Sequence, residues 1–128
     1  MAAGECPADL LYHPSHDWVR IEGDTATFGV TWYAQDLLGE VVFWDGPEPG
    51  AKLVAGRPYA ELESVKAISD VVAALSGEVV EVNKLLTAEP ALVNTAPYGD
   101  GWLVRVRLTD PDERAELLDA AAYEALVG

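Results

Sequence analysis

The chain has 128 residues, half of them apolar, and its 22 acidic residues outnumber its 8 basic residues to give a net charge of −14. This length supports one modest hydrophobic core. A surface with this much negative charge repels nucleic-acid phosphates and anionic membrane surfaces, so neither is an expected partner. No run of about eighteen apolar residues is present to span a membrane, and the single cysteine, Cys6, cannot form an internal disulfide.

The first ten residues lack the basic region and the apolar region that characterise a secretion signal, and they also lack an arginine-rich import sequence. We therefore expect a cytoplasmic protein. We also expect a single domain over residues 1–128, of which residues 1–10 form a loosely ordered N-terminal segment.

Short segments with alternating or β-branched residues, separated by Gly, Asp and Pro, predict a mainly β fold. Because no long helix separates these segments, an antiparallel sandwich or barrel is favoured over a parallel sheet. In the last segment, Leu103 and two arginines are expected on one face, with Trp102 and Val104 on the other. The predicted strands are Trp18–Glu22, Thr25–Val30, Val41–Trp44, Pro58–Glu63, Glu78–Val82 and Trp102–Leu108.

Helices are predicted only as short connections and as a C-terminal cap. Thr31 is suited to cap a short helix over 34–38, which Gly39 would end. Near the C-terminus, Asp110, Pro111 and Glu113 form a helix start signal, with Glu113 as the carboxylate that returns to the cap. A restart at Asp119 is expected. The apolar face of this tail would dock on the sheets through Leu117, Leu118, Ala122, Leu126 and Val127.

A short internal repeat suggests two similar halves. Gly39-Glu-Val-Val recurs as Gly77-Glu-Val-Val, and the step Pro58-Tyr59 recurs as Pro97-Tyr98, at offsets of 38 and 39 residues. The common offset favours two quasi-symmetric small sheets.

Lys66 lies between these halves, in the polar centre of two strand-like runs. Because an unpaired ammonium is costly to bury, we expect Lys66 at the exposed tip of a hairpin. An exposed lysine is usually an ordinary surface residue. Two observations count against that interpretation, since the chain has only three lysines and this one is centred between the two halves.

The residues around Lys66 resemble the lipoyl-attachment segment of the glycine cleavage H proteins. The similarity covers Glu63–Asp70 and Leu75–Asn83 and extends from about Leu11 to the end of the chain. Lipoyl domains of 2-oxo acid dehydrogenases carry Asp-Lys-Ala and biotinyl domains carry Met-Lys-Met, whereas this chain has Val65-Lys66-Ala67. The further matching segments are Tyr12–Val19, Gly29–Phe43, Leu92–Asn94, Pro97–Val104 and Asp119–Leu126.

The resemblance implies a fold and a function. The fold is a lipoyl-domain-like sandwich/barrel hybrid of two quasi-symmetric small sheets, with short helices and a C-terminal helical cap. The function is that of a lipoyl carrier without catalytic activity of its own. It takes the aminomethyl group of glycine from the pyridoxal-phosphate-dependent glycine decarboxylase (P protein) to the aminomethyltransferase (T protein). Dihydrolipoyl dehydrogenase (L protein) then reoxidises it, and lipoyl-attaching enzymes are further expected partners.

The resemblance also implies the roles of particular residues. Lipoic acid would be joined to Lys66 as an amide, flanked by the recognition residues Glu63, Ser64, Val65 and Ala67. In the family the loaded arm folds into a cleft with a serine and carboxylates near the amine, which correspond to Ser15, Asp17 and Asp70. Family members more often have glutamate at the position of Asp17.

Other interpretations stay open at this point. Ser15, His16 and Asp17 are the residue types of a hydrolase triad, although adjacent residues rarely assemble that geometry. His13 and His16 lack a third metal ligand at suitable spacing. The main alternative is a lipoyl relay for other enzymes, or an unmodified H-like interaction module.

Overall fold

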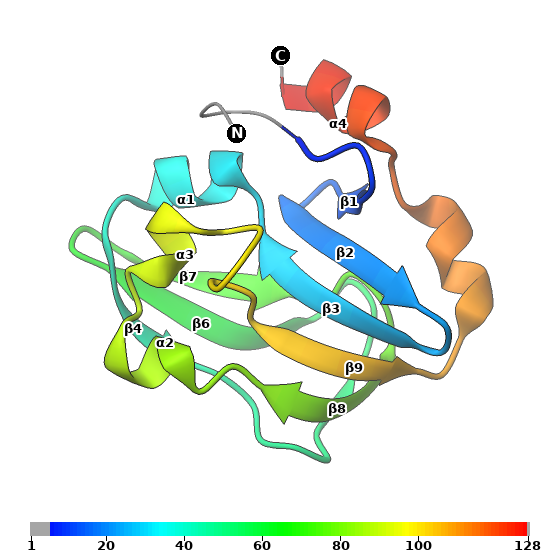
Figure 1. Ribbon diagram of the computed structural model, residues 1–128, viewed down its shortest axis with the longest axis horizontal. Helices are drawn as coiled ribbons and strands as arrows, with labels where there is room; N and C mark the ends of the chain where they lie inside the picture. The colour runs from blue at the N-terminus through cyan, green and yellow to red at the C-terminus, as the bar shows by residue number, and fades with distance from the viewer. Residues whose placement is uncertain (1–5, 128) are drawn as a thin grey trace.

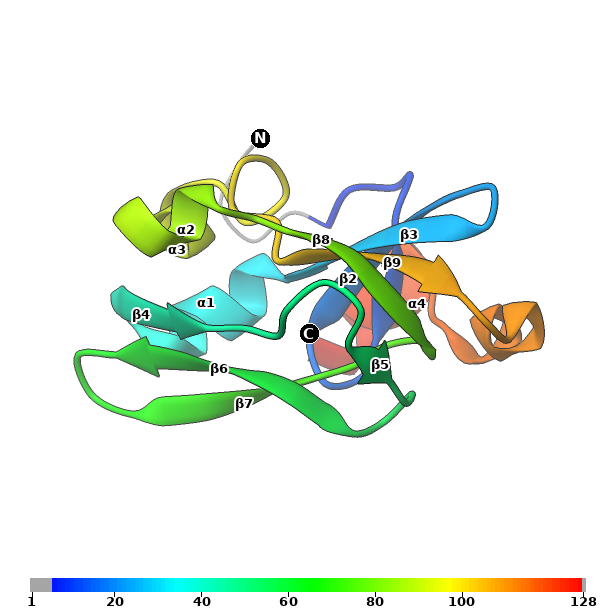
Figure 2. The ribbon, with the colours of Figure 1, turned by 90° about the horizontal axis from the view of Figure 1, so that it is seen from below.

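Two antiparallel sheets face each other across a hydrophobic core in the computed structural model, which describes residues 6–127. The larger sheet has six strands in the order β1-β2-β3-β9-β8-β5, and the smaller sheet has three in the order β4-β6-β7. Figure 1 shows the larger sheet in front of the smaller one, and Figure 2 shows the two layers edge-on. The prediction of a mainly β fold with two sheets and short helices is confirmed.

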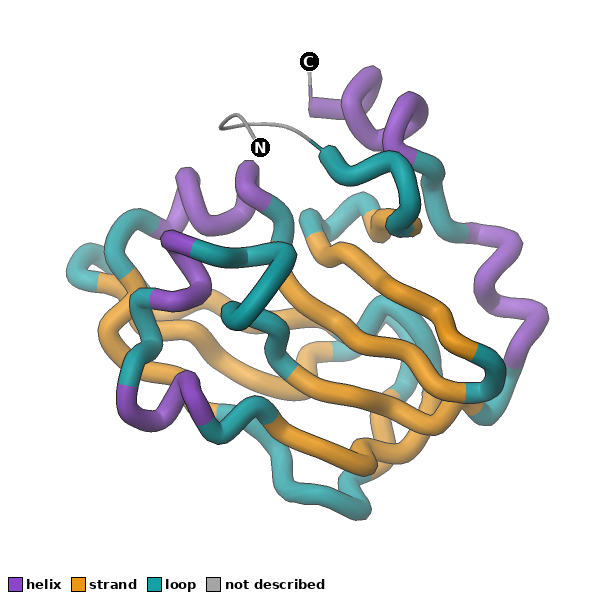
Figure 3. The backbone as a smooth tube through the Cα atoms, viewed as in Figure 1, coloured by secondary structure: helices purple, strands orange, loops and turns teal. Residues whose placement is uncertain are grey.

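Short helices connect the strands at one end of the sheets, and helical segments end the chain (Figure 3). The larger sheet contains β1 (Leu11–His13), β2 (Asp17–Glu22), β3 (Thr25–Val30), β5 (Lys52–Leu53), β8 (Gly77–Val82) and β9 (Val104–Leu108). The smaller sheet contains β4 (Val41–Asp45), β6 (Pro58–Ser64) and β7 (Ile68–Val72). The helices are α1 (Trp32–Leu38), α2 (Leu85–Ala88), α3 (Leu92–Thr95), the 3₁₀ segment η1 (Pro111–Glu116) and α4 (Ala120–Val127).

A tryptophan fixes the register between β2 and β3. Trp18 is fully buried and pairs with Gly29 on the neighbouring strand. A Cβ atom at position 29 would lie within 2.3 Å of the indole ring, so only glycine fits opposite it. The indole Nε1 donates a hydrogen bond of 2.8 Å to the carbonyl of Pro97, which satisfies its one polar group.

The internal repeat Gly-Glu-Val-Val corresponds to a β-bulge in both copies. Val41 of β4 and Val79 of β8 are both buried, and each strand shifts register directly after that residue. Val42 and Val80 lie at these irregularities and are exposed. The two halves therefore use the same β-bulge at equivalent positions, although their sheets differ in strand number.

The predicted strand Trp102–Leu108 is two residues too long. The pairing with β3 and β8 begins at Val104, and just before it the Asn83 side-chain amide donates 2.7 Å hydrogen bonds to the carbonyls of Asp100 and Trp102. Leu103 is fully buried, not on the exposed arginine face. The indole of Trp102 instead packs under the Arg105 guanidinium at 4.2 Å.

At the N-terminus, residues 1–5 lie outside the described part of the chain. Within the segment expected to be loosely ordered, Cys6 and Leu10 are buried against Tyr12, Trp18 and Tyr123. The expectation of a loose segment is therefore wrong for these two residues.

At the C-terminus, the predicted caps are correct and the predicted docking face is partly wrong. Asp110 accepts from the Asp112 amide and Asp119 from the Ala122 amide. The carboxylate of Glu113 does not return to its cap but binds the amide and hydroxyl of Ser76. Leu126 is 55% exposed, and the anchor of α4 is the fully buried Tyr123, which the apolar pattern did not select.

None of the helices within residues 6–127 has the length and apolar composition needed to cross a membrane.

Candidate functional site

Lys66 lies at the tip of the β6–β7 hairpin, as the sequence predicts, and is exposed. The buried Ser64 side chain holds the turn. Its hydroxyl oxygen accepts from the amides of Lys66 (3.3 Å) and Ala67 (3.1 Å), while the Ser64 amide donates to the Ala67 carbonyl at 2.8 Å. A serine that satisfies the amides of a turn fixes the backbone without covering it. Lys66 is therefore presented on an ordered turn.

The hairpin tip rests on the connection between α1 and β4. The Val65 amide donates to the Glu40 carbonyl at 3.0 Å, and the Lys66 side chain passes over Gly39, where an added Cβ would lie 3.1 Å from Lys66 Cε. Asn94 of α3 secures this connection, because its amide donates to the Gly39 carbonyl and its oxygen accepts from the Val41 amide. Elements distant in sequence thus position the lysine.

The other predicted recognition residues occupy different environments. Glu63, Val65 and Ala67 are exposed around the lysine, whereas Ser64 is buried beneath the turn. Val65 is 68% exposed.

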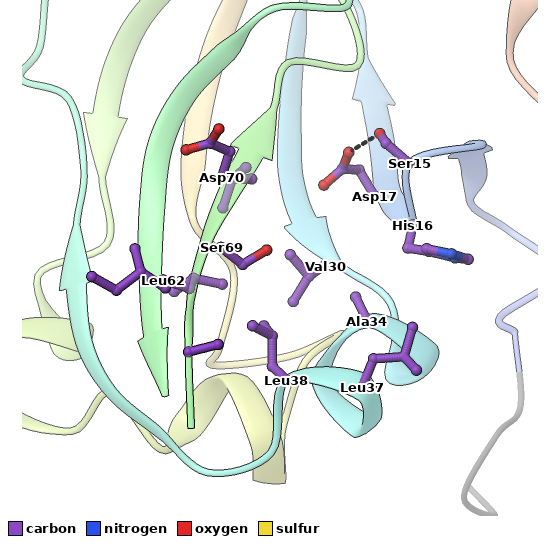
Figure 4. A pocket seen from close by; sticks show the side chains of 13 residues that line it. Ser15, His16, Asp17, Val30, Ala34, Leu37, Leu38, Leu62, Ser69 and Asp70 are labelled. Atoms are coloured by element: carbon purple, nitrogen blue, oxygen red, sulfur yellow. Dashed lines mark hydrogen bonds between the residues drawn. The ribbon is translucent and has the colours of Figure 1, made fainter. Parts of the chain in front are cut away.

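A cleft of about 320 Å³ begins beside the hairpin tip. It runs between β7, the start of β2 and helix α1, and brings together all three side chains predicted for the arm-protecting cleft, Ser15, Asp17 and Asp70 (Figure 4). Ala67, directly after Lys66, also lines it. A group attached to Lys66 would therefore have an adjoining cavity to enter.

The two carboxyl groups of the cleft differ in environment. Asp17 is 4% exposed, and burial raises its pKa from 3.8 to about 8, although the hydrogen bond with Ser15 opposes this shift. The oxygens Ser15 Oγ and Asp17 Oδ2 are 2.6 Å apart. Asp70 lies at the exposed rim, paired across the sheet with Glu61. Burial therefore favours the protonated form of the inner carboxyl group.

Replacing Asp17 with asparagine should stabilise the protein increasingly as the pH rises. Between pH 4 and pH 8 the folded chain holds a proton on Asp17 that the unfolded chain has released, so the free energy of unfolding falls by up to about 1.4 kcal/mol per pH unit. A neutral amide at this position carries no such penalty. Urea denaturation at pH 5 and pH 8 measures the difference, with Asp70→Asn as the control. An equal effect of Asp17→Asn at both pH values would contradict a neutral Asp17.

The structure adds cleft residues that sequence reasoning missed. Figure 4 shows the Ser69 hydroxyl directed into the cleft, with Val30 and Leu38 lining it from β3 and α1. Strand alternation could not single out Ser69, because its neighbours Ile68, Asp70 and Val71 line the cleft as well. Leu37, which is 68% exposed, lines the cleft from a separate element, helix α1, so the sequence around Lys66 did not indicate it.

His16 does not form a hydrolase triad with its neighbours. Its Nδ1 is 2.6 Å from the Tyr123 hydroxyl, and that hydroxyl is also 2.7 Å from Thr31 Oγ1. A triad needs the histidine between the serine and the carboxylate, whereas here Ser15 bonds directly to Asp17. His16 has a left-handed backbone, with φ of 71°, and forms part of the cleft edge.

Comparisons with known proteins agree with one another. The family model described as glycine cleavage H-protein matches residues 10–128. The mitochondrial glycine cleavage system H protein of Pisum sativum is 53% identical over 114 residues, covering 89% of this chain and 69% of that protein. The glycine cleavage system H protein of Sodalis glossinidius is 54% identical over 122 residues, covering 94% and 93%.

The fold is shared as well. A crystal structure of a glycine cleavage system H protein from Mycobacterium marinum superposes with a TM-score of 0.88 at 39% identity, covering 96% of this chain and 99% of that one. The chain therefore belongs to the glycine cleavage H-protein family.

Proposed function

We propose that Lys66 carries lipoic acid as an amide and that the protein is the mobile carrier of a glycine cleavage system. The observation that carries this proposal is the presentation of Lys66 on a Ser64-locked turn directly beside a cleft. Both features serve a covalently attached arm, because the lysine is accessible to a modifying enzyme and the cavity is within reach of the modified side chain.

The residues of the cleft fit such an arm and its cargo. Ala34, Leu38, Leu62 and Val71 provide an apolar lining for the hydrocarbon chain, and the polar groups of Ser15 and Asp17 lie together on the β2 side. When attached, lipoic acid supplies a disulfide that accepts the aminomethyl group of glycine and is later restored by oxidation. The one cysteine of the chain, Cys6, is buried, so the chain itself offers no exposed thiol for this work.

The partners in this proposal are the glycine decarboxylase, the aminomethyltransferase and dihydrolipoyl dehydrogenase, together with an enzyme that attaches the lipoyl group. The chain carries and its partners catalyse. Its net charge of −14 favours fast association with positively charged surfaces on the partner enzymes, because opposite charges accelerate association.

Ser15, Asp17 and Asp70 are proposed to hold the cargo amine while the arm lies in the cleft. Asp17 would bind it from the inner wall and Asp70 from the rim. Although aspartate is shorter than the glutamate more common in the family, the strand position of Asp17 places its carboxyl group on the cleft wall.

The double variant Asp17→Asn/Asp70→Asn should shorten the lifetime of the loaded protein. Losing a hydrogen bond to a charged group costs about 1.5–3 kcal/mol, so hydrolysis should be on the order of tenfold to a hundredfold faster. Release of formaldehyde from the loaded, purified protein measures the rate, and Asp45→Asn, outside the cleft, is the control. An unchanged rate in the double variant would exclude these carboxyl groups from protecting the cargo.

A reconstituted assay separates this function from a lipoyl relay or an unmodified interaction module. With the three partner enzymes present, the lipoylated chain should support glycine-dependent reduction of NAD. A relay would be lipoylated but inactive in this assay, and an interaction module would carry no lipoyl group.

A further inference from the structure

One side chain of α3 holds the connection on which the hairpin tip rests. Asn94 Oδ1 accepts a hydrogen bond of 2.8 Å from the Val41 amide, and its Nδ2 donates one of 2.7 Å to the Gly39 carbonyl. The same nitrogen lies 3.1 Å from Oε1 of the buried Gln35 in α1. Asn94 therefore binds the backbone on both sides of Glu40.

The Glu40 carbonyl and the Val41 amide belong to one peptide unit. In a trans peptide unit the N–H and the C=O point in opposite directions within one plane. On one side the N–H of this unit donates to Asn94, and on the other side its C=O accepts from the Val65 amide at 3.0 Å. A hydrogen-bonded series therefore runs from α3, through a single peptide plane, to the residue directly before Lys66.

This series is the attachment of the turn to the rest of the molecule. Residues 65–67 are all exposed, so side-chain burial does not hold them. Among the hydrogen bonds of these three residues in the described chain, only that of the Val65 amide reaches beyond the hairpin. Hydrogen bonds in series strengthen one another, and a peptide plane bound at both ends cannot rotate freely. Asn94 thus supports the contact that orients the tip.

We propose that Asn94 is a positioning residue for lipoyl attachment, because it holds the peptide unit that fixes Val65 and, with it, the orientation of Lys66. This inference rests on the proposed carrier function. In the attachment step the Lys66 amine displaces AMP from lipoyl adenylate, which forms the amide and releases AMP and a proton. Asn94 contacts none of these groups. It raises the fraction of chains in the orientation that the attaching enzyme binds, and apparent affinity scales with that fraction.

The kinetics of attachment test this role through Asn94→Ala, which removes the acceptor and the donor together. A lipoate–protein ligase with lipoate and ATP modifies the unlipoylated chain, and mass spectrometry gives initial rates at varied chain concentration. KM for the chain should rise on the order of tenfold, while kcat should change by less than about twofold. The two constants separate because a misoriented tip binds weakly, whereas a bound chain reacts normally.

Asn83→Ala distinguishes positioning from a general loss of stability. The Asn83 amide also donates to two carbonyls, those of Asp100 and Trp102, and its Oδ1 accepts from the Leu85 amide at 3.0 Å. None of these partners belongs to the hairpin or to residues 39–41. With rates expressed per folded chain, from urea denaturation of each variant, Asn83→Ala should leave KM unchanged.

Amide hydrogen exchange measured by NMR tests the series without any lipoyl group. The Val65 amide should be protected in the unchanged chain, and its protection should fall on the order of tenfold in Asn94→Ala. The Ser64 amide, which donates to Ala67 within the turn, should keep its protection. Asn94→Asp keeps an acceptor for the Val41 amide, so it should restore most of the Val65 protection and of the affinity for the ligase.

Four results would each overturn the positioning role. They are an unchanged KM in Asn94→Ala, an equal rise of KM in Asn83→Ala, equal losses in Asn94→Asp and Asn94→Ala, and a Val65 amide that exchanges freely in the unchanged chain. The last of these can be measured even if Asn94→Ala does not fold. All four are compatible with a lipoyl group on Lys66. An unchanged chain that the ligase leaves unmodified at Lys66 would instead refute the proposed function.

Discussion

Replacing Lys66 with arginine should abolish glycine-dependent turnover in the reconstituted system and leave the fold intact. The guanidinium of arginine keeps the positive charge but stays protonated at all physiological pH values, so it cannot form the amide that a lysine amine forms. Because Lys66 is exposed on its turn, its replacement should change the free energy of unfolding by less than about 0.5 kcal/mol.

Lys52→Arg is the matched control, since Lys52 is also an exposed lysine and lies in β5, where it pairs with Glu78. It should retain full turnover and full lipoylation. Residual activity in Lys66→Arg above the level without the protein would mean that the arm is attached elsewhere or is not needed.

Tyr123→Ala should produce the largest loss of stability among single changes in the C-terminal helix. The ring is fully buried, stacks on Tyr12 at 4.8 Å between centroids, and its hydroxyl contacts His16 and Thr31 at the cleft edge. Removing a buried aromatic side chain costs about 3–5 kcal/mol, a large part of the roughly 5–15 kcal/mol that typically stabilises a domain. Thermal unfolding should occur on the order of 10–20 °C lower.

Leu126→Ala on the same helix is the control, because Leu126 is 55% exposed and should change stability little. Tyr123→Phe keeps the ring and removes the contacts to His16 and Thr31, so it should cost about 1 kcal/mol. Equal losses for Tyr123→Ala and Leu126→Ala in thermal unfolding would show that the tyrosine does not anchor α4.

The sequence predicted the strands of the core well because alternation and turn residues are local signals. Thr25–Val30 was predicted with its observed ends, and Thr31 caps α1 as expected. The strand at Trp102 was predicted two residues too long, and the hydrogen bonds of Asn83 to the carbonyls of Asp100 and Trp102 come from another element that local alternation does not reveal. Tyr123 was missed because its partners Tyr12, His16 and Thr31 lie about a hundred residues away.

The candidate site was predicted in the same uneven way. The exposed hairpin position of Lys66 follows from the residues themselves, whereas its lipoyl role came from the family resemblance. The resemblance also named Ser15, Asp17 and Asp70, and the structure places all three along one cleft. The 2.6 Å contact between His13 Nδ1 and Ser15 Oγ had no sequence signal beyond the proximity of the two residues in the chain.

Mass spectrometry of the intact protein, purified from its native host, tests the central claim most directly. We predict a mass equal to that of the bare chain plus one lipoyl amide, and fragmentation should locate the increment on the peptide that contains Lys66. A bare mass, a biotin increment, or a lipoyl group on Lys52 or Lys84 would contradict the claim.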